Sequence, residues 1–130
     1  MPNPTPAMRE RYLADSVATA SPVKLLLMLF DRLIVDLNRG EQALLAGDRP
    51  EANTQLKHAQ DIVTELHVSL DLDAWDGAAG LASLYAFVET ELITANIRGD
   101  AAKVASVRGL MEPLRDTWRE AAMTLAAAEG

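Results

Sequence analysis

The sequence predicts an all-α protein, an antiparallel up-down four-helix bundle with a short additional N-terminal helical segment. Three observations support this fold class. Apolar residues recur at intervals of three and four, which is the period of one helix face. Capping and stop signals divide the chain into four such stretches. No stretch alternates strictly between apolar and polar residues, as a half-buried strand would. Amphipathic helices joined by short connections are expected to pack antiparallel.

The composition is typical of one globular domain of 130 residues. Apolar residues make up 49% of the chain and aromatic residues only 5%, so the core is expected to be mostly Leu, Val, Ala and Met. A net charge of −7 makes nucleic acid a poor partner. The lack of cysteine excludes disulfides and cysteine-based zinc sites and fits a reducing cytoplasm. No signal peptide is recognised, and no apolar run reaches the length of about 18 residues that membrane insertion requires.

The N-terminal region precedes the bundle proper. Residues 1–7 contain three of the six prolines and are expected to form a disordered tail. Residues 8–18 are expected to form a short helical segment that carries Tyr12 and Val17. Ser21 and the proline after it then mark a helix start, because serine caps free backbone N–H groups and proline suits the first helical position.

The first long helix is predicted over residues 22–46 and ends at Gly47. Its buried stripe is predicted to contain Leu25, Leu26, Leu29, Leu33 and Leu37. The run from Leu25 to Phe30 consists of six large apolar residues, which surround the helix. Because a stripe covers only part of a helix circumference, another element of the chain or a partner must cover the remaining apolar surface.

Three further helices are predicted over residues 49–70, 79–98 and 100–127. Asp48 is expected to cap the first of these, and Glu51 follows at the spacing of a capping box. Its apolar seam steps by four and three through Ala52, Leu56, Ala59, Val63, Leu66 and Leu70. Such a heptad spacing predicts nearly parallel helix axes. The longest loop is expected between this helix and the next.

Asp100 is expected to cap the last helix, and Pro113 lies in the middle of it. Proline removes a backbone hydrogen bond, here the bond to Gly109, at a cost of about 3 kcal/mol in a helix interior. The apolar seam nevertheless continues beyond the proline, so a kinked helix is expected and not two separate helices.

The sequence contains no catalytic or metal-binding motif, and no cofactor is expected. The two histidines, His58 and His67, form neither a Glu-x-x-His nor a His-x-x-x-His pair, and both are interpreted as surface residues. The seams of the helices at 49–70 and 100–127 hold no polar group that could serve chemistry inside a bundle. A small enzyme with a surface cleft would need a partly buried polar cluster, which the sequence does not show.

Surplus apolar residues indicate an interaction surface. Leu27, Met28 and Val35 lie opposite the main stripe of their helix, and Ile62 lies on a flank of the 49–70 seam. The N-terminal segment or a partner could cover them, and the pattern leaves both open. Burying three such side chains yields about 5–9 kcal/mol, whereas micromolar binding needs about 8 kcal/mol. A tight partner must therefore extend over several helices.

Several short motifs occur in a fixed order over residues 9–122. They are Tyr12 followed by Val17-Ala-Thr-Ala-Ser-Pro, then Met28-Leu-Phe-Asp, Ala59-Gln-x-Ile-Val-x-Glu-Leu, Ala95-Asn-Ile before a Gly-Asp turn, and Leu114-Arg-Asp-x-Trp. No single motif is decisive, but their joint occurrence is specific. In this set the sequence resembles the FliS family of flagellar secretion chaperones. Phe30, where family members often carry tyrosine, and Pro113 depart from the family pattern.

The resemblance implies an antiparallel helical bundle in the bacterial cytosol. It also implies binding of the disordered C-terminal segment of flagellin in apolar grooves, protection from premature polymerisation, and delivery to the export-gate membrane protein. The N-terminal segment would cover part of the groove and be displaced. The partner-binding residues that the resemblance and the surplus surface suggest are Tyr12, Val17, Leu27, Met28, Val35, Ile62, Leu66 and Asn96. A monomer or weak homodimer is expected; the alternative is a structural bundle that self-associates through the surplus face of residues 22–46.

Overall fold

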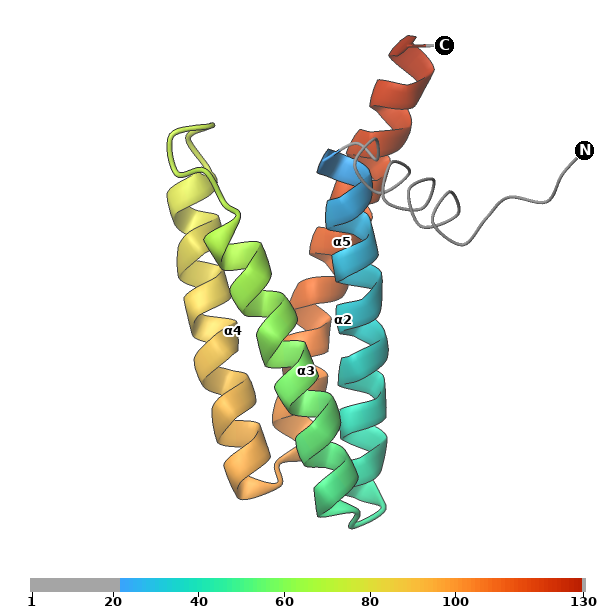
Figure 1. The fold of residues 1–130 in the computed structure, drawn as a ribbon, viewed down its shortest axis with the longest axis vertical. Coiled ribbons are helices and arrows are strands. Elements are labelled where there is room, and N and C mark those ends of the chain that lie inside the picture. Colours follow the sequence, from blue (N-terminus) through green and yellow to red (C-terminus); the bar gives the residue numbers. More distant parts are fainter. Residues whose placement is uncertain (1–21, 130) are drawn as a thin grey trace, which may run out of the picture.

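The computed structural model describes residues 22–129, which form four α-helices (Figure 1). These are α2 (Pro22–Leu45), α3 (Arg49–Val68), α4 (Ala78–Arg98) and α5 (Ala101–Glu129). The colours of Figure 1 show that successive helices run in opposite directions along the long axis. The all-α fold class predicted from sequence is confirmed. The expected tail, the N-terminal segment with Tyr12 and Val17, and the Ser21 cap lie outside the described residues.

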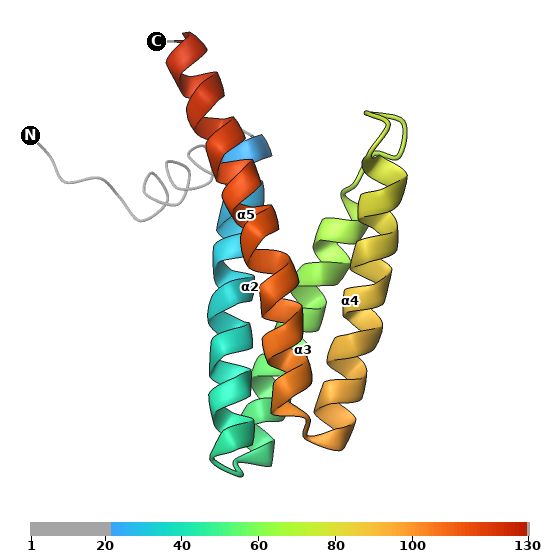
Figure 2. The same ribbon diagram turned by 180° about the vertical axis from the view of Figure 1, so that it is seen from behind.

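The four helices form a ring in which α2 packs against α3 and α5, and α4 packs against the same two helices. The two short connections, α2–α3 and α4–α5, lie together at one end of the bundle (Figure 2). At the other end the pair α3 and α4 leans away from the pair α2 and α5 in both views. We call these the closed end and the open end.

Both tight connections use a left-handed glycine followed by an aspartate cap. Gly47 and Gly99 adopt φ values of 74° and 67°, a region that L side chains rarely enter. Asp48 and Asp100 then accept hydrogen bonds from the backbone N–H groups of Glu51 (3.2 Å) and Lys103 (3.0 Å). The two predicted caps are thereby confirmed.

Only half of the expected capping box forms at the start of α3. The Glu51 carboxylate accepts a hydrogen bond from Gln55 Nε2 at 2.7 Å. The N–H of Asp48, which a capping box would bind to Glu51, instead donates to the carbonyl of Ala43 at 2.8 Å. A carbonyl at the end of α2 therefore accepts the hydrogen bond that the Glu51 carboxylate would accept in a capping box.

The core contains apolar side chains from all four helices. It is centred on Phe30, Leu33, Leu37, Leu56, Val63, Tyr85, Val88, Leu92, Val104, Val107 and Met111. The buried stripe predicted for α2 is wrong at one residue, because Leu25 is 38% exposed. It lies near the start of α2, at the open end, where the pair α3 and α4 diverges from the pair α2 and α5.

Helix α5 runs unbroken through Pro113, as the continuing seam predicts. Pro113 is exposed, and so is Gly109, whose carbonyl loses its usual partner to the proline. Because water has access to this turn, the missing hydrogen bond leaves no buried polar group. Solvent exposure therefore explains why a proline is tolerated in this helix.

Gly40 allows α2 and α3 to approach closely near the closed end. A Cβ atom at this buried position would lie 2.7 Å from Cδ2 of Leu56, which is itself fully buried. A Cβ atom at Gly109, also within a helix, meets nothing within 4 Å.

We therefore expect alanine at these two glycines to have opposite effects. Gly109→Ala should stabilise the protein by up to about 1 kcal/mol, because alanine is the better helix former. Gly40→Ala should be destabilising, since overpacking a core costs about 1–3 kcal/mol and outweighs the same gain in propensity. Urea denaturation of both variants measures the difference, and equal shifts in the midpoint would show that the contact with Leu56 imposes no constraint.

Candidate functional site

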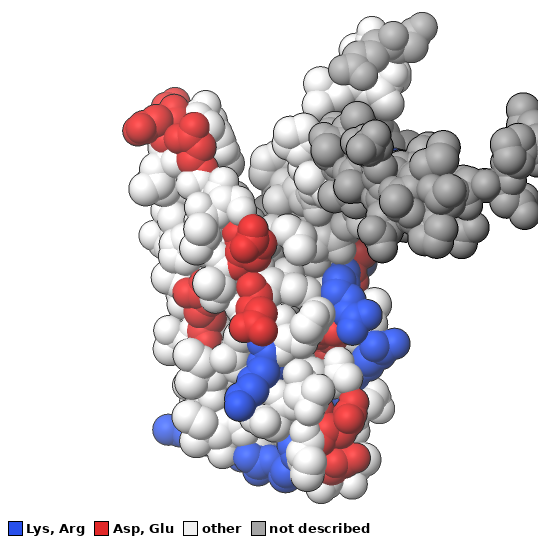
Figure 3. All heavy atoms as spheres, viewed as in Figure 1, with Lys and Arg blue, Asp and Glu red and all other residues white. Residues whose placement is uncertain are grey.

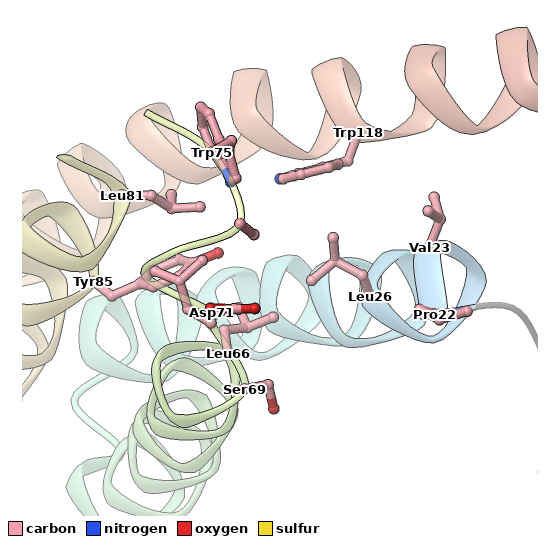
Figure 4. A pocket seen from close by; sticks show the side chains of 12 residues that line it. Pro22, Val23, Leu26, Leu66, Ser69, Asp71, Trp75, Leu81, Tyr85 and Trp118 are labelled. Atoms are coloured by element: carbon pink, nitrogen blue, oxygen red, sulfur yellow. The ribbon is translucent and has the colours of Figure 1, made fainter. Parts of the chain in front are cut away.

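A cavity of about 430 Å³ opens between the diverging helices at the open end (Figure 4). Its lining comes from every described helix and from the α3–α4 loop, and includes Leu26, Leu66, Leu70, Trp75, Tyr85 and Trp118. Figure 4 shows Val23 and Leu26 of α2 pointing across this space towards α5, which carries Trp118.

A second cavity, of about 570 Å³, lies against the outer side of the same end of α2. Leu25, Met28 and Leu29 of α2 line it together with Glu65 of α3. The two cavities share Pro22, Leu26, Leu66 and Ser69 in their linings, so they adjoin one another around the start of α2. We call the two together the apolar groove.

The amino-acid sequence of α2 creates this groove. Six large apolar residues surround its first turns. These turns lie at the open end, where the pair α3 and α4 diverges from the pair α2 and α5. Met28 is consequently 59% exposed, while Leu26 and Leu29 are only partly buried against the core. The surplus apolar surface predicted on this helix therefore exists, and the described helices leave much of it open to solvent.

The structure brings together only two of the predicted partner-binding residues that it describes. Met28 lies on the rim of the groove, and Leu66, which is 2% exposed, forms part of its floor. Val35 is exposed and Leu27 half-buried, but both lie outside the lining of the groove.

Asn96 lies far from the groove, at the closed end. Its Nδ2 donates a hydrogen bond of 2.8 Å to Oδ1 of Asn53 on α3. In the same region, Nη2 of Arg49 donates to the backbone carbonyls of Asn96 and Ile97, two of the last carbonyls of α4. These contacts join α3 to α4. They give Asn96 and Arg49 a structural role.

Ile62 is not the exposed flank that the helical spacing suggested. Its side chain is 6% exposed and belongs to the core cluster. Helix α3 packs against both α2 and α4, so the buried stripe is wide enough to include Ile62 beside Val63. A seam drawn from heptad spacing alone is too narrow for a helix with two neighbours.

Acidic side chains border the groove. Glu65 contributes to the second cavity and Asp71 to the first. Figure 3 shows red patches along the face of α3 and at the tip of the α3–α4 loop, on the side of the molecule that faces the viewer in Figure 1. With a net charge of −7, this border disfavours an occupant that brings carboxylates to the groove.

Tyr85 forms the deep wall of the first cavity and packs 6.1 Å from the ring of His67, centre to centre. Burial raises the pKa of the Tyr85 hydroxyl from 10 to about 12, because the phenolate would have to lose its water.

A phenol with a raised pKa makes stability sensitive to alkaline pH. Below pH 10 the hydroxyl is protonated in both folded and unfolded chains, so its contribution is constant. Between pH 10 and about 12 the unfolded chain releases the proton first, and stability should fall with rising pH. Urea denaturation as a function of pH measures this loss, and Tyr85→Phe should remove most of it. A loss of the same size in the variant would assign it to other groups.

The sequence pattern did not predict that a charged residue, Asp36, is buried. Asp36 of α2 is fully buried, accepts a hydrogen bond from Arg32 Nε at 3.0 Å, and pairs with Nδ1 of His58 on α3. His58 is exposed, as expected, but it is not an isolated surface residue. The spacing contains a signal for Asp36, since it follows Leu33 by three positions within the buried stripe.

The described residues contain no arrangement typical of catalysis or metal binding. No group of three or more His, Cys, Asp or Glu side chains among them could hold a metal ion. The charged side chains near the bundle instead form ion pairs between helices, such as Arg108 with Glu41 at 2.9 Å and Lys103 with Glu91 at 2.8 Å. A search of the described helices for a segment of sufficient length and apolarity to cross a lipid bilayer found none.

Comparisons with known proteins give consistent matches to one family in sequence. The family model described as "Flagellar protein FliS" matches residues 4–125. The "Flagellar secretion chaperone FliS" of Bacillus subtilis (strain 168) is 32% identical over 110 residues, which are 85% of this chain and 82% of that protein. The protein of the same name from Escherichia coli (strain K12) is 30% identical over 122 residues, which are 92% and 90% of the two chains.

A solved structure has the same fold. It is described as "Crystal structure of flagellar chaperone from bacteria" and aligns with a TM-score of 0.74 and 20% sequence identity. The alignment covers 92% of this chain and 99% of that one.

Proposed function

The chain belongs to the FliS family, a family of flagellar export chaperones and not of enzymes, and on that premise we propose that it binds the C-terminal segment of flagellin in the apolar groove. In this proposal the complex forms in the bacterial cytosol and keeps flagellin from polymerising prematurely. The chaperone then presents its cargo to the membrane protein of the export gate.

The observation that carries the proposal is the apolar groove itself. Its two adjoining cavities, of about 430 and 570 Å³, have mostly apolar linings, and the described residues leave them open. An amphipathic helix binds by laying its apolar face into such a groove. The groove also extends over several helices, which the energetics of a tight partner require, because three side chains alone are too few.

The direct test is co-purification with flagellin from the same bacterium. We expect full-length flagellin to be retained and flagellin without its C-terminal segment to be lost. Calorimetry with the C-terminal peptide should give one binding site and a negative heat-capacity change, and circular dichroism should show added helix. Equal retention of both flagellins would contradict the proposed binding segment.

Met28→Glu tests the groove within this proposal. Met28 is exposed, so the variant should fold normally, but its carboxylate would lie on the rim beside Glu65. Losing the burial of one large apolar side chain, worth about 1.5–3 kcal/mol, should weaken binding of the peptide by about 10- to 100-fold in calorimetry.

Ile97→Glu is the matched control. It introduces the same charge at an apolar residue that is 73% exposed and lies at the closed end, where α4 ends. Its affinity should remain that of the parent protein. If the two variants bound equally well or lost affinity equally, the groove would not be the binding site.

Self-association through α2 is the competing interpretation. The exposed face around Met28 and Val35 could bury itself against a second copy in a symmetric dimer. Light scattering over a range of concentrations distinguishes the two. We expect a monomer or weak dimer that converts to a 1:1 complex with the peptide, whereas a stable dimer that ignores the peptide would support the competing interpretation.

A further inference from the structure

Trp118 brings a buried hydrogen-bond donor to the wall of the apolar groove. Its indole Nε1 is buried and has no hydrogen-bond partner among the described residues, while its ring lines the first cavity. Figure 4 shows the nitrogen end of this indole pointing across the cavity towards Trp75. A buried donor without an acceptor is costly, and native structures contain few of them. This one therefore calls for an acceptor that the described part of the chain does not supply.

We propose that Trp118 Nε1 donates a hydrogen bond to a neutral carbonyl oxygen of the segment bound in the groove, and thereby fixes the register of that segment. The inference rests on the proposed function, because it takes the flagellin segment as the occupant. Apolar contacts supply most of the affinity but few positional constraints. One directed donor in an otherwise apolar cavity selects which part of the occupant lies beside it.

The charges around the cavity decide which acceptor is suitable. An indole N–H can only donate, so its partner must be an oxygen or a similar acceptor. A carboxylate would lie near Asp71, which lines the same cavity, and near Glu65 of the adjoining one. Like charges this close repel one another, whereas a carbonyl of the backbone or of an Asn or Gln side chain has no net charge.

Helix geometry narrows the choice further. Inside an α-helix every backbone carbonyl already accepts a bond from the N–H four residues later, and only the last four carbonyls are free. A backbone carbonyl available to Trp118 therefore lies where a helix of the occupant ends or is interrupted. The alternative source is an amide side chain on a continuous helix. Both supply the same neutral carbonyl group.

Nitrogen-15 labelling of the tryptophans gives a direct readout, because the chain has only two of them. In a proton–nitrogen correlation spectrum, Trp75→Phe identifies the indole signal of Trp118. We expect that signal to move downfield, and its proton to exchange more slowly with solvent, when the flagellin C-terminal peptide saturates the protein. A peptide with every Asn and Gln replaced by Ala keeps the shift if the acceptor is a backbone carbonyl and loses it if the acceptor is an amide side chain.

Trp118→Phe provides the second readout, since it removes the donor and retains an aromatic ring. Affinity for the peptide should fall by about 3- to 10-fold, the value of one neutral hydrogen bond. The Tm of the free protein should stay the same or rise, because the variant no longer buries an unpaired donor. A purely structural tryptophan would lower Tm without this selective loss of affinity. Phe87→Leu is the control: it removes an exposed aromatic ring of α4 that lines neither cavity, and it should bind like the parent protein.

The outcomes separate the inference from the proposed function. A peptide that does not bind at all overturns both. A peptide that binds while the Trp118 signal stays in place, or while Trp118→Phe binds like the parent, overturns the role of the donor and leaves the proposed function intact. An indole signal already shifted downfield in the free full chain would also overturn the inference, because the donor would then have an acceptor without any ligand.

Discussion

Replacing Ile62 with glutamate is expected to unfold the protein. The side chain is 6% exposed and belongs to the core between α3 and its two neighbours. Truncating a buried isoleucine costs about 2–5 kcal/mol, and an ionised carboxylate in the same place adds a desolvation penalty. The total exceeds about 4 kcal/mol, which approaches the entire stability of a small domain at about 5–15 kcal/mol. Circular dichroism should show a large loss of helix or a sharply lowered Tm.

Two companion variants make this result specific. Ile62→Val should remain folded and lose only about 0.5–1.5 kcal/mol, because it removes a single methylene from the same site. Met28→Glu introduces the same charge on an exposed residue and should retain the parent Tm within a few degrees, as surface substitutions generally do. If Ile62→Glu were as stable as Met28→Glu, the position of Ile62 in the core would be wrong and its side chain would face solvent.

The spacing of residues along the sequence determines where the helices lie, but it does not determine which faces of them are buried. Apolar period, glycine stops and the aspartate caps at Asp48 and Asp100 act within a few residues, so the four helices could be read directly from the chain. Which side of a helix is buried depends on how many neighbours that helix has. Ile62 looked like a surplus residue because a single seam was assumed, whereas α3 contacts both α2 and α4.

The groove could be predicted only in part for the same reason. The run from Leu25 to Phe30 indicates more apolar surface than one buried stripe can hold, and Met28 is exposed in the structure. The position of the cavities follows from the divergence of the helices at the open end, which local spacing does not encode. Trp75 and Tyr85 line the first cavity from a loop and from the next helix, and no periodicity in α2 points to them.

Removing both partners of Asp36 is expected to have the second large effect on stability. The carboxylate is completely buried, and among the described residues Arg32 and His58 pair with it. Either Arg32→Ala or His58→Ala leaves one partner, and each should cost about 1 kcal/mol. The double variant leaves a buried carboxylate without a cationic or hydrogen-bonding partner from these residues, and we expect a loss of about 3–5 kcal/mol, more than the sum of smaller single effects.

The double variant should lose more than the two single variants together because the three side chains differ in their access to water. The side chains of Arg32 and His58 are about half exposed, so either can be hydrated when the carboxylate is removed, but Asp36 has no such access to water. Adding Asp36→Leu to the double variant should therefore restore much of the lost stability, because an apolar side chain of similar size needs no partner. Urea denaturation of the four variants completes the comparison. Purely additive losses, or a triple variant no more stable than the double, would show that the three side chains do not act as a unit that joins α2 to α3.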